Sequence, residues 1–242
     1  MVLIQIKIYG LLLLILSISA CTAQQITTST TTITATSTTA QADGHDVSFT
    51  TDDNLTIFAK YWHRGTEKKI ILLHMLGRDS SNWEEFAENL PYTTIAIDLR
   101  GHGQSDGDWQ SFQDADFNNM ILDVKAANEF TGGETVVIGA SIGANVALNY
   151  ADNYDADGIA LLSPSYDYRG VDTRAAIARY KGALLIVSSR DDEQSYNPSI
   201  SMHNLSPSDK KQLKTYDDAG HGTDMLDKED LDDLILQWID SI

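Results

Sequence analysis

The sequence predicts an α/β fold in which a mostly parallel sheet is covered by helices on both faces. Short, continuous apolar runs alternate with helical patterns from about residue 44 onwards, and strands of this kind are buried on both faces of a parallel sheet. One such run leads directly into Gly139-Ala140-Ser141-Ile142-Gly143, and a helical pattern follows it. About 200 residues belong to this part of the chain, which is enough for one domain with a full core.

The predicted order of elements starts with a hairpin, because residues 47–51 and 55–63 alternate apolar and polar side chains around Asp52-Asp53-Asn54. The other strands are expected where apolar runs are continuous, at 69–74, 94–99, 136–139, 158–162, 183–188 and 213–217. Helical patterns lie at 80–89, 114–130, 142–150 and 173–180. A final helix carries one apolar face, formed by Leu231, Leu234, Ile235, Trp238 and Ile242.

Two helix ends carry recognisable signals. We expect Ser80 or Ser81 to cap the helix at 80–89, with Glu84 as the capping-box partner of Ser81. Gly132-Gly133 is expected to end the helix at 114–130, because glycine adopts the left-handed conformation that ends many helices.

The N-terminus has the pattern of an export signal. Lys7 precedes an apolar stretch at 8–16, and small residues follow. Ile18-Ser19-Ala20-Cys21 resembles the lipobox of prokaryotic lipoprotein signals, which implies a signal peptide at 1–20 and acylation of Cys21. The alternative is that residues 1–20 stay as an uncleaved membrane anchor, since they are long enough to span a bilayer. Either interpretation predicts an extracytoplasmic domain attached to the membrane.

A tether is expected between this signal and the domain. Residues 22–42 are nearly all Thr, Ser, Ala and Gln, with no periodicity, so they have too little to bury to offset their ordering entropy. The predicted organisation is therefore a signal at 1–20, a lipidated Cys21 with a disordered tether to residue 43, and a domain at 44–242. Cys21 is the only cysteine, so no disulfide can form within the chain.

The formal net charge of −18 limits the partners of the domain. The chain has no cluster of lysine and arginine that could form the basic surface that nucleic-acid binding needs. The same charge gives no attraction to anionic lipid. We therefore expect a solvated acidic surface and no nucleic-acid partner.

The most informative segment is Gly139-Ala140-Ser141-Ile142-Gly143, which has the G-x-S-x-G pattern of a nucleophile elbow. Glycines are needed on both sides, because strand and helix approach so closely at this turn that a Cβ would clash. A serine hydroxyl needs a base and a group that orients the base. Both types follow predicted strands, in Ser188-Ser189-Arg190-Asp191-Asp192-Glu193 and in Tyr216-Asp217-Asp218-Ala219-Gly220-His221-Gly222.

From residue 47 to the C-terminus the chain resembles the α/β-hydrolase superfamily, in the order Ser, Asp, His and in the D-x-R-G-x-G-x-S turn formed by residues 98–105. The resemblance implies Ser141 as nucleophile and His221, within Gly220-His221-Gly222, as base. It places the acid at Asp192, in a pattern like H-G-x-x-D with serines replacing His-Gly, and leaves Asp191 as the alternative. It implies no cofactor and a mostly parallel sheet, and the short connection at 163–180 predicts little or no lid.

An oxyanion hole is expected from two backbone N–H groups. One belongs to Ile142, directly after the nucleophile. The other is implied by His74-Met75-Leu76-Gly77, which resembles the H-G-x-G loop of the family and makes Leu76 the donor by position. Met75 stands where glycine is usual, so Met75 itself is the alternative donor.

The remaining histidines and acidic residues are expected to be structural. His74 and His102 are predicted to support their loops through hydrogen bonds, and no histidine pair has metal-ligand spacing on a shared helix face. Asp191-Asp192-Glu193 lacks the alternating ligands of a calcium loop. No metal site is therefore expected.

The predicted pocket is open, because residues 163–180 leave room for only one short helix where lidded relatives insert a cap. Its walls are expected to be Met75, Leu76, Trp83, Trp109, Tyr166, Tyr168 and Met225. These inferences together predict a carboxylesterase that acts on small esters. A peptidase, a thioesterase, a dienelactone-type hydrolase or a cofactor-free haloperoxidase could use the same residues, and a non-catalytic binding module is the alternative of another class.

Overall fold

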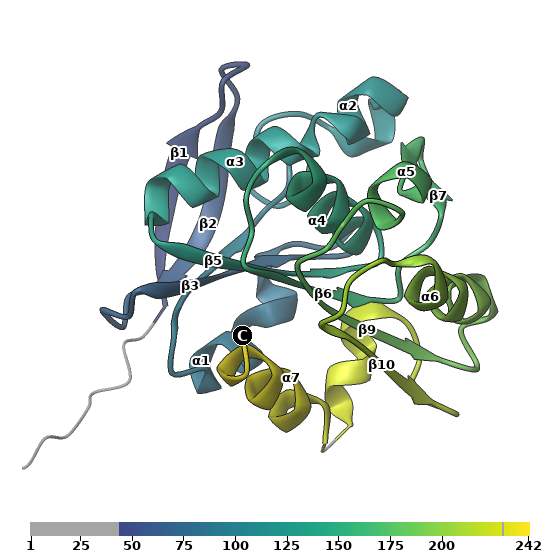
Figure 1. Ribbon diagram of the computed structural model, residues 1–242. Helices are drawn as coiled ribbons and strands as arrows, with labels where there is room; N and C mark the ends of the chain where they lie inside the picture. Colours follow the sequence, from purple (N-terminus) through teal and green to yellow (C-terminus); the bar gives the residue numbers. More distant parts are fainter. Residues whose placement is uncertain (1–43, 229) are drawn as a thin grey trace, which may run out of the picture. The chain divides into compact units, whose positions relative to one another are not determined.

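The computed structural model describes residues 44–228 and 230–242. The predicted signal peptide, the acylated Cys21 and the tether lie outside these residues. An eight-stranded sheet runs in the order β1-β2-β4-β3-β5-β6-β9-β10 (Figure 1). Its strands are β1 (His45–Thr50), β2 (Thr56–Trp62), β3 (Lys68–Leu73), β4 (Thr93–Ile97), β5 (Glu134–Ala140), β6 (Gly158–Leu162), β9 (Ala183–Ser189) and β10 (Lys211–Tyr216).

The sheet is antiparallel only where the predicted hairpin joins it. β1 pairs with β2 and β2 with β4 in antiparallel register, whereas every pair from β4 to β10 is parallel. The mostly parallel sheet is therefore confirmed. The parallel strands β3, β5, β6, β9 and β10 all end on the same side of the sheet. The loops that follow these strands therefore lie together.

Helices cover both faces of the sheet (Figure 1). One face carries α2 (Asp114–Asn118), α3 (Met120–Thr131), α4 (Ile142–Asn153), α5 (Arg174–Ile177) and α6 (Glu193–Leu205); the other carries α1 (Glu84–Asn89) and α7 (Leu231–Asp240). Each face has its own apolar core, because successive residues of a strand point to opposite sides. In β3, Ile71 and Leu73 pack towards α3 and α4, while Ile70 and Leu72 pack towards α1 and α7.

Three short helical turns complete the described chain, η1 (Ser80–Trp83), η2 (Trp109–Ser111) and η3 (Gly222–Asp227), together with a small hairpin formed by β7 (Asp167–Tyr168) and β8 (Val171–Asp172). The hairpin and α5 fill the connection from β6 to β9, where the sequence predicted one short helix. No helix among the described residues is long and apolar enough to span a bilayer.

Two of the predicted helices are wrong in detail. The helix expected at 80–89 starts as the 3₁₀ turn η1, and its cap is Asp79, whose carboxylate accepts a hydrogen bond from Ser81 N at 3.0 Å. The helix expected at 114–130 is broken at Asn119 into α2 and α3. Beside the break, the Asn118 side chain donates hydrogen bonds to the carbonyl oxygens of Asp114 and Gly170. An asparagine side chain that bonds the backbone in this way competes with the regular hydrogen bonds of a helix.

Helix α6 was not predicted at all. Its buried residues are Ser195, Ser199 and Met202, so the face at helical spacing contains only one apolar side chain. Pro198 lies inside the helix, where proline removes a backbone donor and normally ends a helical pattern. Packing against β9 therefore stabilises this helix, and the local sequence pattern does not predict it.

One carboxyl group on α7 is predicted to destabilise the fold at neutral pH. Asp232 faces a cavity of about 480 Å³ between α1 and η3, and its Oδ1 is buried with no hydrogen-bond partner in the described part of the chain. Burial, followed by the charges of Glu85 and Asp233, raises the pKa of Asp232 to about 6. The folded state therefore holds this proton more tightly than the unfolded state, so the contribution of Asp232 to stability falls as pH rises from about 4 to about 6.

Asp232→Asn should therefore raise the free energy of unfolding at pH 8 by about 1 kcal/mol, after allowance for solvent screening. At pH 4 the variant and the wild type should be equally stable, because the wild-type carboxyl is then protonated. Urea unfolding at both pH values measures this difference, with the exposed Asp155→Asn as control. A variant less stable than the wild type at pH 8 would contradict the assignment.

Candidate active site

Ser141 lies at the sharp turn between β5 and α4. Its backbone has φ 56° and ψ −119°, a conformation that L-residues rarely adopt and that costs about 1–3 kcal/mol. The flanking glycines are required by space. A Cβ on Gly139 would lie 2.2 Å from the Gly143 carbonyl oxygen, and a Cβ on Gly143 would lie 2.6 Å from the Leu73 carbonyl oxygen. Strand, turn and helix are thus packed as a nucleophile elbow needs.

His221 and Asp192 form a hydrogen-bonded pair, although they follow different strands. His221 follows β10, Asp192 follows β9, and Nδ1 of His221 lies 2.7 Å from Oδ2 of Asp192. Burial acts to raise the pKa of Asp192, but its hydrogen bond to His221, the charge of His221 and the nearby hydroxyls of Ser163 and Ser195 outweigh burial and lower it. An ionised carboxylate can only accept, so Nδ1 carries the hydrogen, and in the neutral imidazole Nε2 is then the acceptor.

Asp191 has a different set of contacts. Its carboxylate accepts from the Ser189 hydroxyl and from the backbone N–H groups of Ala219 and Gly220, at 3.3 and 3.1 Å. The hydroxyl of Ser189 lowers the pKa of Asp191. Asp191 therefore holds the loop that carries His221, whereas Asp192 contacts the imidazole ring. The sequence offered the two carboxylates as alternatives and did not predict a role for both.

The loop that carries His221 packs directly against the elbow. A Cβ on Gly222 would lie 2.3 Å from Sδ of Met75 and 3.4 Å from Cβ of Ala140, the residue before Ser141. Its backbone N–H donates to Oγ of Ser163 at 3.0 Å. The structure therefore brings Ser141, His221 and Asp192 to three neighbouring loops at one edge of the sheet.

The loop after β3 is fixed by His74, a fully buried residue. Nδ1 of His74 lies 2.7 Å from the Met75 carbonyl oxygen, and Nε2 accepts from Leu99 N at 3.0 Å. Burial, followed by the charge of His102, lowers the pKa of His74 to about 3, so the ring is neutral and Nδ1 is the donor. The Met75 carbonyl also accepts from Arg78 N at 3.1 Å. Because the peptide is planar, fixing this carbonyl also fixes the opposite direction of the Leu76 N–H.

His102 supports the same region from the next loop. Its Nδ1 lies 3.0 Å from the Arg100 carbonyl oxygen, and its ring stacks on Trp109 with centroids 5.6 Å apart. Trp109 in turn lies against Gly77. The predicted supporting roles of His74 and His102 agree with these contacts. Ile142, the other predicted oxyanion donor, is in the first turn of α4, where backbone N–H groups have no partner within the helix.

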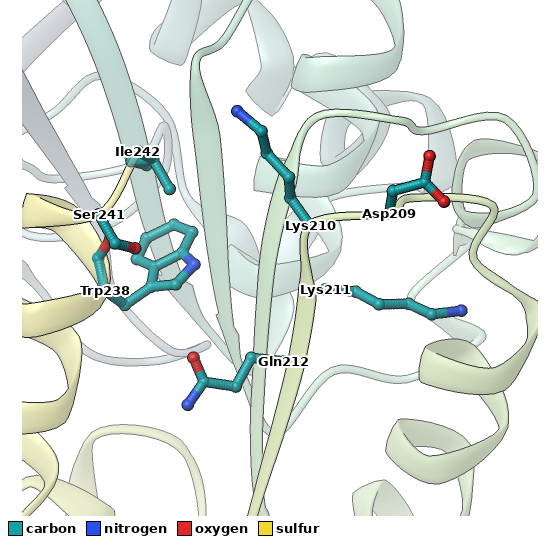
Figure 2. A pocket seen from close by; sticks show the side chains of 7 residues that line it. All are labelled: Asp209, Lys210, Lys211, Gln212, Trp238, Ser241 and Ile242. Carbon is teal, nitrogen blue, oxygen red and sulfur yellow. The ribbon is translucent and has the colours of Figure 1, made fainter.

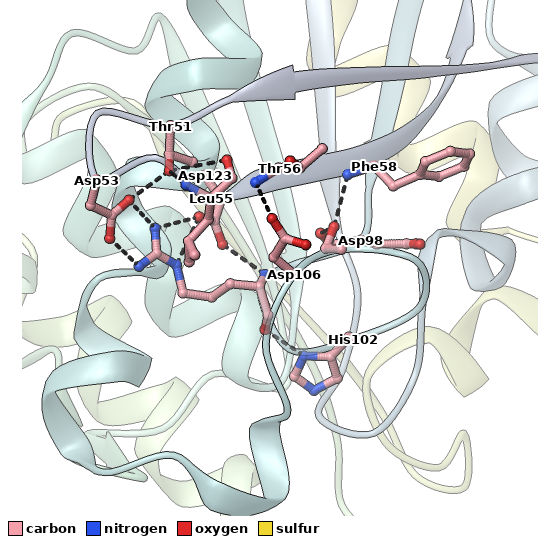
Figure 3. A network of polar contacts seen from close by, with 11 residues as sticks. Thr51, Asp53, Leu55, Thr56, Phe58, Asp98, His102, Asp106 and Asp123 are labelled. Atoms are coloured by element: carbon pink, nitrogen blue, oxygen red, sulfur yellow. Dashed lines mark hydrogen bonds and ion pairs between the residues drawn. The ribbon is translucent and has the colours of Figure 1, made fainter.

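The D-x-R-G-x-G-x-S turn is held by buried polar contacts (Figure 3). The Asp98 carboxylate accepts from Ser80 N and Gln104 N, at 2.7 and 2.8 Å. The guanidinium of Arg100 lies between two carboxylates, 2.7 Å from Asp53 and 2.7 Å from Asp123. This turn therefore joins the β1–β2 hairpin, the η1 region and α3 behind the candidate site.

Two of the predicted pocket walls are wrong. Trp83 and Met225 are fully buried in the core on the α1 and α7 face, so they pack the core and cannot line an open pocket. Leu76, Trp109 and Tyr166 are partly buried, and Tyr168 is exposed. A separate cavity of about 260 Å³ lies at the opposite edge of the sheet, between the start of β10 and the end of α7 (Figure 2). It contains none of the predicted site residues.

No metal centre is found in the described ranges. Within residues 44–228 and 230–242, no three histidine, cysteine, aspartate or glutamate residues are placed to hold a metal ion. Asp191 and Asp192 are engaged with the Gly220 and His221 loop instead.

Comparison with known proteins agrees with this architecture. The sequence profile described as alpha/beta hydrolase fold matches residues 68–178. The AB hydrolase superfamily protein YisY of Bacillus subtilis is 32% identical over 127 residues, which cover 50% of this chain and 45% of that protein. Residues 68–178 therefore match the α/β-hydrolase family, and the mostly parallel sheet with its helices agrees with that fold. The alignment thus spans about half the length of that curated relative.

Solved structures share the same fold at low sequence identity. An esterase from Pyrococcus furiosus superposes with a TM-score of 0.73 at 19% identity, over 83% of this chain and 91% of that one. An esterase from Exiguobacterium antarcticum gives a TM-score of 0.69 at 14% identity, over 80% of this chain and 99% of that one. These similarities define the fold alone.

Proposed function

We propose that this protein is a serine hydrolase, and that it is a carboxylesterase acting on small esters. The observation that carries the proposal is the hydrogen bond between His221 and Asp192, on a loop that packs against the residue before the strained Ser141. A paired histidine with its free nitrogen as acceptor is what a serine needs to become a nucleophile. The esterases among the similar structures favour an ester as substrate.

The proposed reaction has two steps. Oγ of Ser141 attacks the ester carbonyl carbon while Nε2 of His221 takes the hydroxyl proton, and Asp192 stabilises the imidazolium that forms. The tetrahedral intermediate collapses, the alcohol leaves with the proton from His221, and an acyl-enzyme remains on Ser141. Water then attacks the acyl-enzyme with His221 again as base, which releases the carboxylic acid and restores Ser141.

The oxyanion would be bound by the N–H groups of Ile142 and Leu76. The hydrogen bond of the Met75 carbonyl with His74 favours Leu76 over Met75, because it fixes the peptide that carries the Leu76 N–H. Preorganised donors of this kind contribute about 10²–10³ in kcat each. The mechanism needs no cofactor.

The substrate is proposed to be short because the connection from β6 to β9 is small and tied down. Asn145 of α4 donates to the Val171 carbonyl at 3.0 Å and accepts from Ser165 N at 3.0 Å. These two hydrogen bonds hold the β7–β8 hairpin against α4. The hairpin therefore has little freedom to open over a long acyl chain. A peptidase, a thioesterase or a dienelactone-type hydrolase would use the same three residues, and a non-catalytic binding module would not be expected to retain the His221–Asp192 pair.

We expect p-nitrophenyl acetate and butyrate to have kcat/KM values at least about tenfold above the value for the palmitate ester. The reason is that a group that does not fit a pocket costs a few kcal/mol of transition-state binding energy. The measurement is a series of p-nitrophenyl esters of increasing chain length. Matched amide and thioester substrates separate the peptidase and thioesterase alternatives. A sharp rise in rate above the solubility limit of a long-chain ester would contradict the absence of a mobile lid.

We also propose that the mature protein is an extracytoplasmic lipoprotein anchored through Cys21. The acidic domain gives no electrostatic attraction to anionic lipid, so the acyl chains alone would hold it, and two or three chains anchor stably where one does so marginally. Cys21→Ser should abolish incorporation of a palmitate analogue and leave esterase activity unchanged. Label that persists in this variant, or a retained segment 1–20 in the wild type, would contradict the lipobox interpretation.

A further inference from the structure

Ser163 occupies the strand end between the proposed nucleophile and the proposed acid. It directly follows β6, which lies between β5 and β9 in the sheet. On one side, Ser141 N donates to the Leu162 carbonyl at 2.9 Å, and on the other, Ser163 N donates to the Val187 carbonyl at 2.8 Å. Ser163 is therefore fixed by its backbone to the strands that carry both of these residues.

The conformation of Ser163 is strained. Its φ is 53°, and within the described ranges only Asn54, Ser141 and Arg169 share a positive φ among residues other than glycine. Asn54 is in a hairpin turn and Arg169 at an exposed hairpin tip, whereas Ser141 and Ser163 end two adjacent strands of the sheet. Strain of this kind persists only where the surroundings hold it in place. Glycine would adopt this backbone without strain. What serine adds at this position, compared with glycine, is its hydroxyl group.

The hydroxyl of Ser163 contacts the loop that carries the proposed base. The side chain is buried, and its Oγ accepts the N–H of Gly222, the residue after His221, at 3.0 Å. A hydroxyl that accepts one hydrogen bond keeps its own hydrogen to donate. The Ser163 hydroxyl is one of the groups that lower the pKa of Asp192, so it lies close to that carboxylate.

We propose that Ser163 is a positioning residue that holds Asp192 and the loop of His221 in register with each other. The inference rests on the proposed function, because the register matters for a serine hydrolase. The hydroxyl bonds the peptide after the imidazole and lies close to the carboxylate that orients the imidazole. Losing the hydroxyl frees the loop by a fraction of an ångström, and a misplacement of about 1 Å can cost on the order of 100-fold in rate.

The test compares Ser163→Gly and Ser163→Ala with the wild type. Both variants lack the hydroxyl, and the glycine variant also removes the strain, so it should fold normally. We expect kcat for a short ester to fall by about 10- to 100-fold in both, with KM changed by less than about threefold. The matched control is Ser199→Ala, which removes a buried hydroxyl that has no hydrogen-bond partner among the described residues and should leave kcat unchanged.

A double-mutant cycle separates positioning from simple structural damage. In an Asp192→Asn background, Ser163→Gly should cost less than about threefold, because both changes act on the same pair. A loss equal to that in the wild-type background, or a Ser163→Gly variant that keeps at least half of the wild-type kcat, would overturn the inference.

A second readout keeps the inference independent of the reaction. The Nδ1 proton of His221, hydrogen-bonded to Asp192, should give a low-field proton NMR signal in the wild type that broadens or is lost in Ser163→Gly and persists in Ser199→Ala. If the wild type neither hydrolyses esters nor reacts with a fluorophosphonate, the proposed function fails, and the NMR comparison still decides whether Ser163 holds the pair. An unchanged signal in Ser163→Gly would refute the inference.

Discussion

Ser141→Ala and His221→Ala should each lower kcat for a short ester by roughly 10⁴–10⁶, while the double variant should be little worse than either. The reason is that the hydroxyl is a weak nucleophile without its base, and the base has nothing to activate without the hydroxyl. Steady-state kinetics on purified variants measure these losses. The fold should be retained, because Ser141 and His221 are both only partly buried.

The neighbouring carboxylates provide an internal control for this prediction. Asp192→Asn should cost less than the loss of Ser141 or His221, because it removes the orienting partner and leaves the base in place. Asp191→Asn should cost less again, since the contacts of Asp191 are with Ser189 and with the loop before His221, and Asp192 is the residue that contacts the imidazole. If Asp191→Asn is the more damaging change, the acid has been assigned to the wrong residue.

Arg100→Met should lower the free energy of unfolding by about 3–5 kcal/mol, the largest effect on stability that we expect. Arg100 is almost fully buried and contacts Asp123, whose side chain is fully buried, through Nε and Nη2 at 2.8 and 2.7 Å. Burial raises the pKa of Asp123 to about 6 even though Arg100 opposes the shift. Without Arg100 an ionised Asp123 would be left without a cationic partner.

The expected loss depends on pH and on the partner that remains. It should be smaller at pH 5 than at pH 8, because Asp123 without its arginine takes up a proton. Asp53→Asn should cost much less, since Asp53 is one-third exposed, and Asp123→Leu added to Arg100→Met should recover part of the loss. Urea unfolding decides between these outcomes. A loss below about 1 kcal/mol at pH 8 would mean that the buried ion pair does not stabilise the turn.

The sequence predicted the strands well because their physical signal is local. A short continuous apolar run such as β5 or β9, between turn residues, is typical of a strand buried on both faces, and each one ends in a loop at the same edge. The glycines of the elbow follow from the same local argument, since a Cβ at Gly139 or Gly143 meets backbone at less than 3 Å. The candidate nucleophile and base were therefore accessible from the sequence.

What the sequence missed depends on contacts between distant segments. Helix α6 has two serines and one methionine on its buried face, so no pattern of hydrophobicity indicates it. The different contacts of Asp191 and Asp192 follow from where residues 219–221 lie. The place of Ser163 between acid and base depends on a hydrogen bond to Gly222, which is 59 residues further along the chain.

The central claim is that Ser141 is a nucleophile activated by His221. The most direct measurement is labelling with a fluorophosphonate, followed by intact-mass analysis and peptide mapping of the wild type and of Ser141→Ala. The proposed function predicts one adduct per chain in the wild type, located on Ser141 and accompanied by loss of esterase activity, with no adduct in Ser141→Ala. An unlabelled wild type, or an adduct that persists in Ser141→Ala, would contradict it.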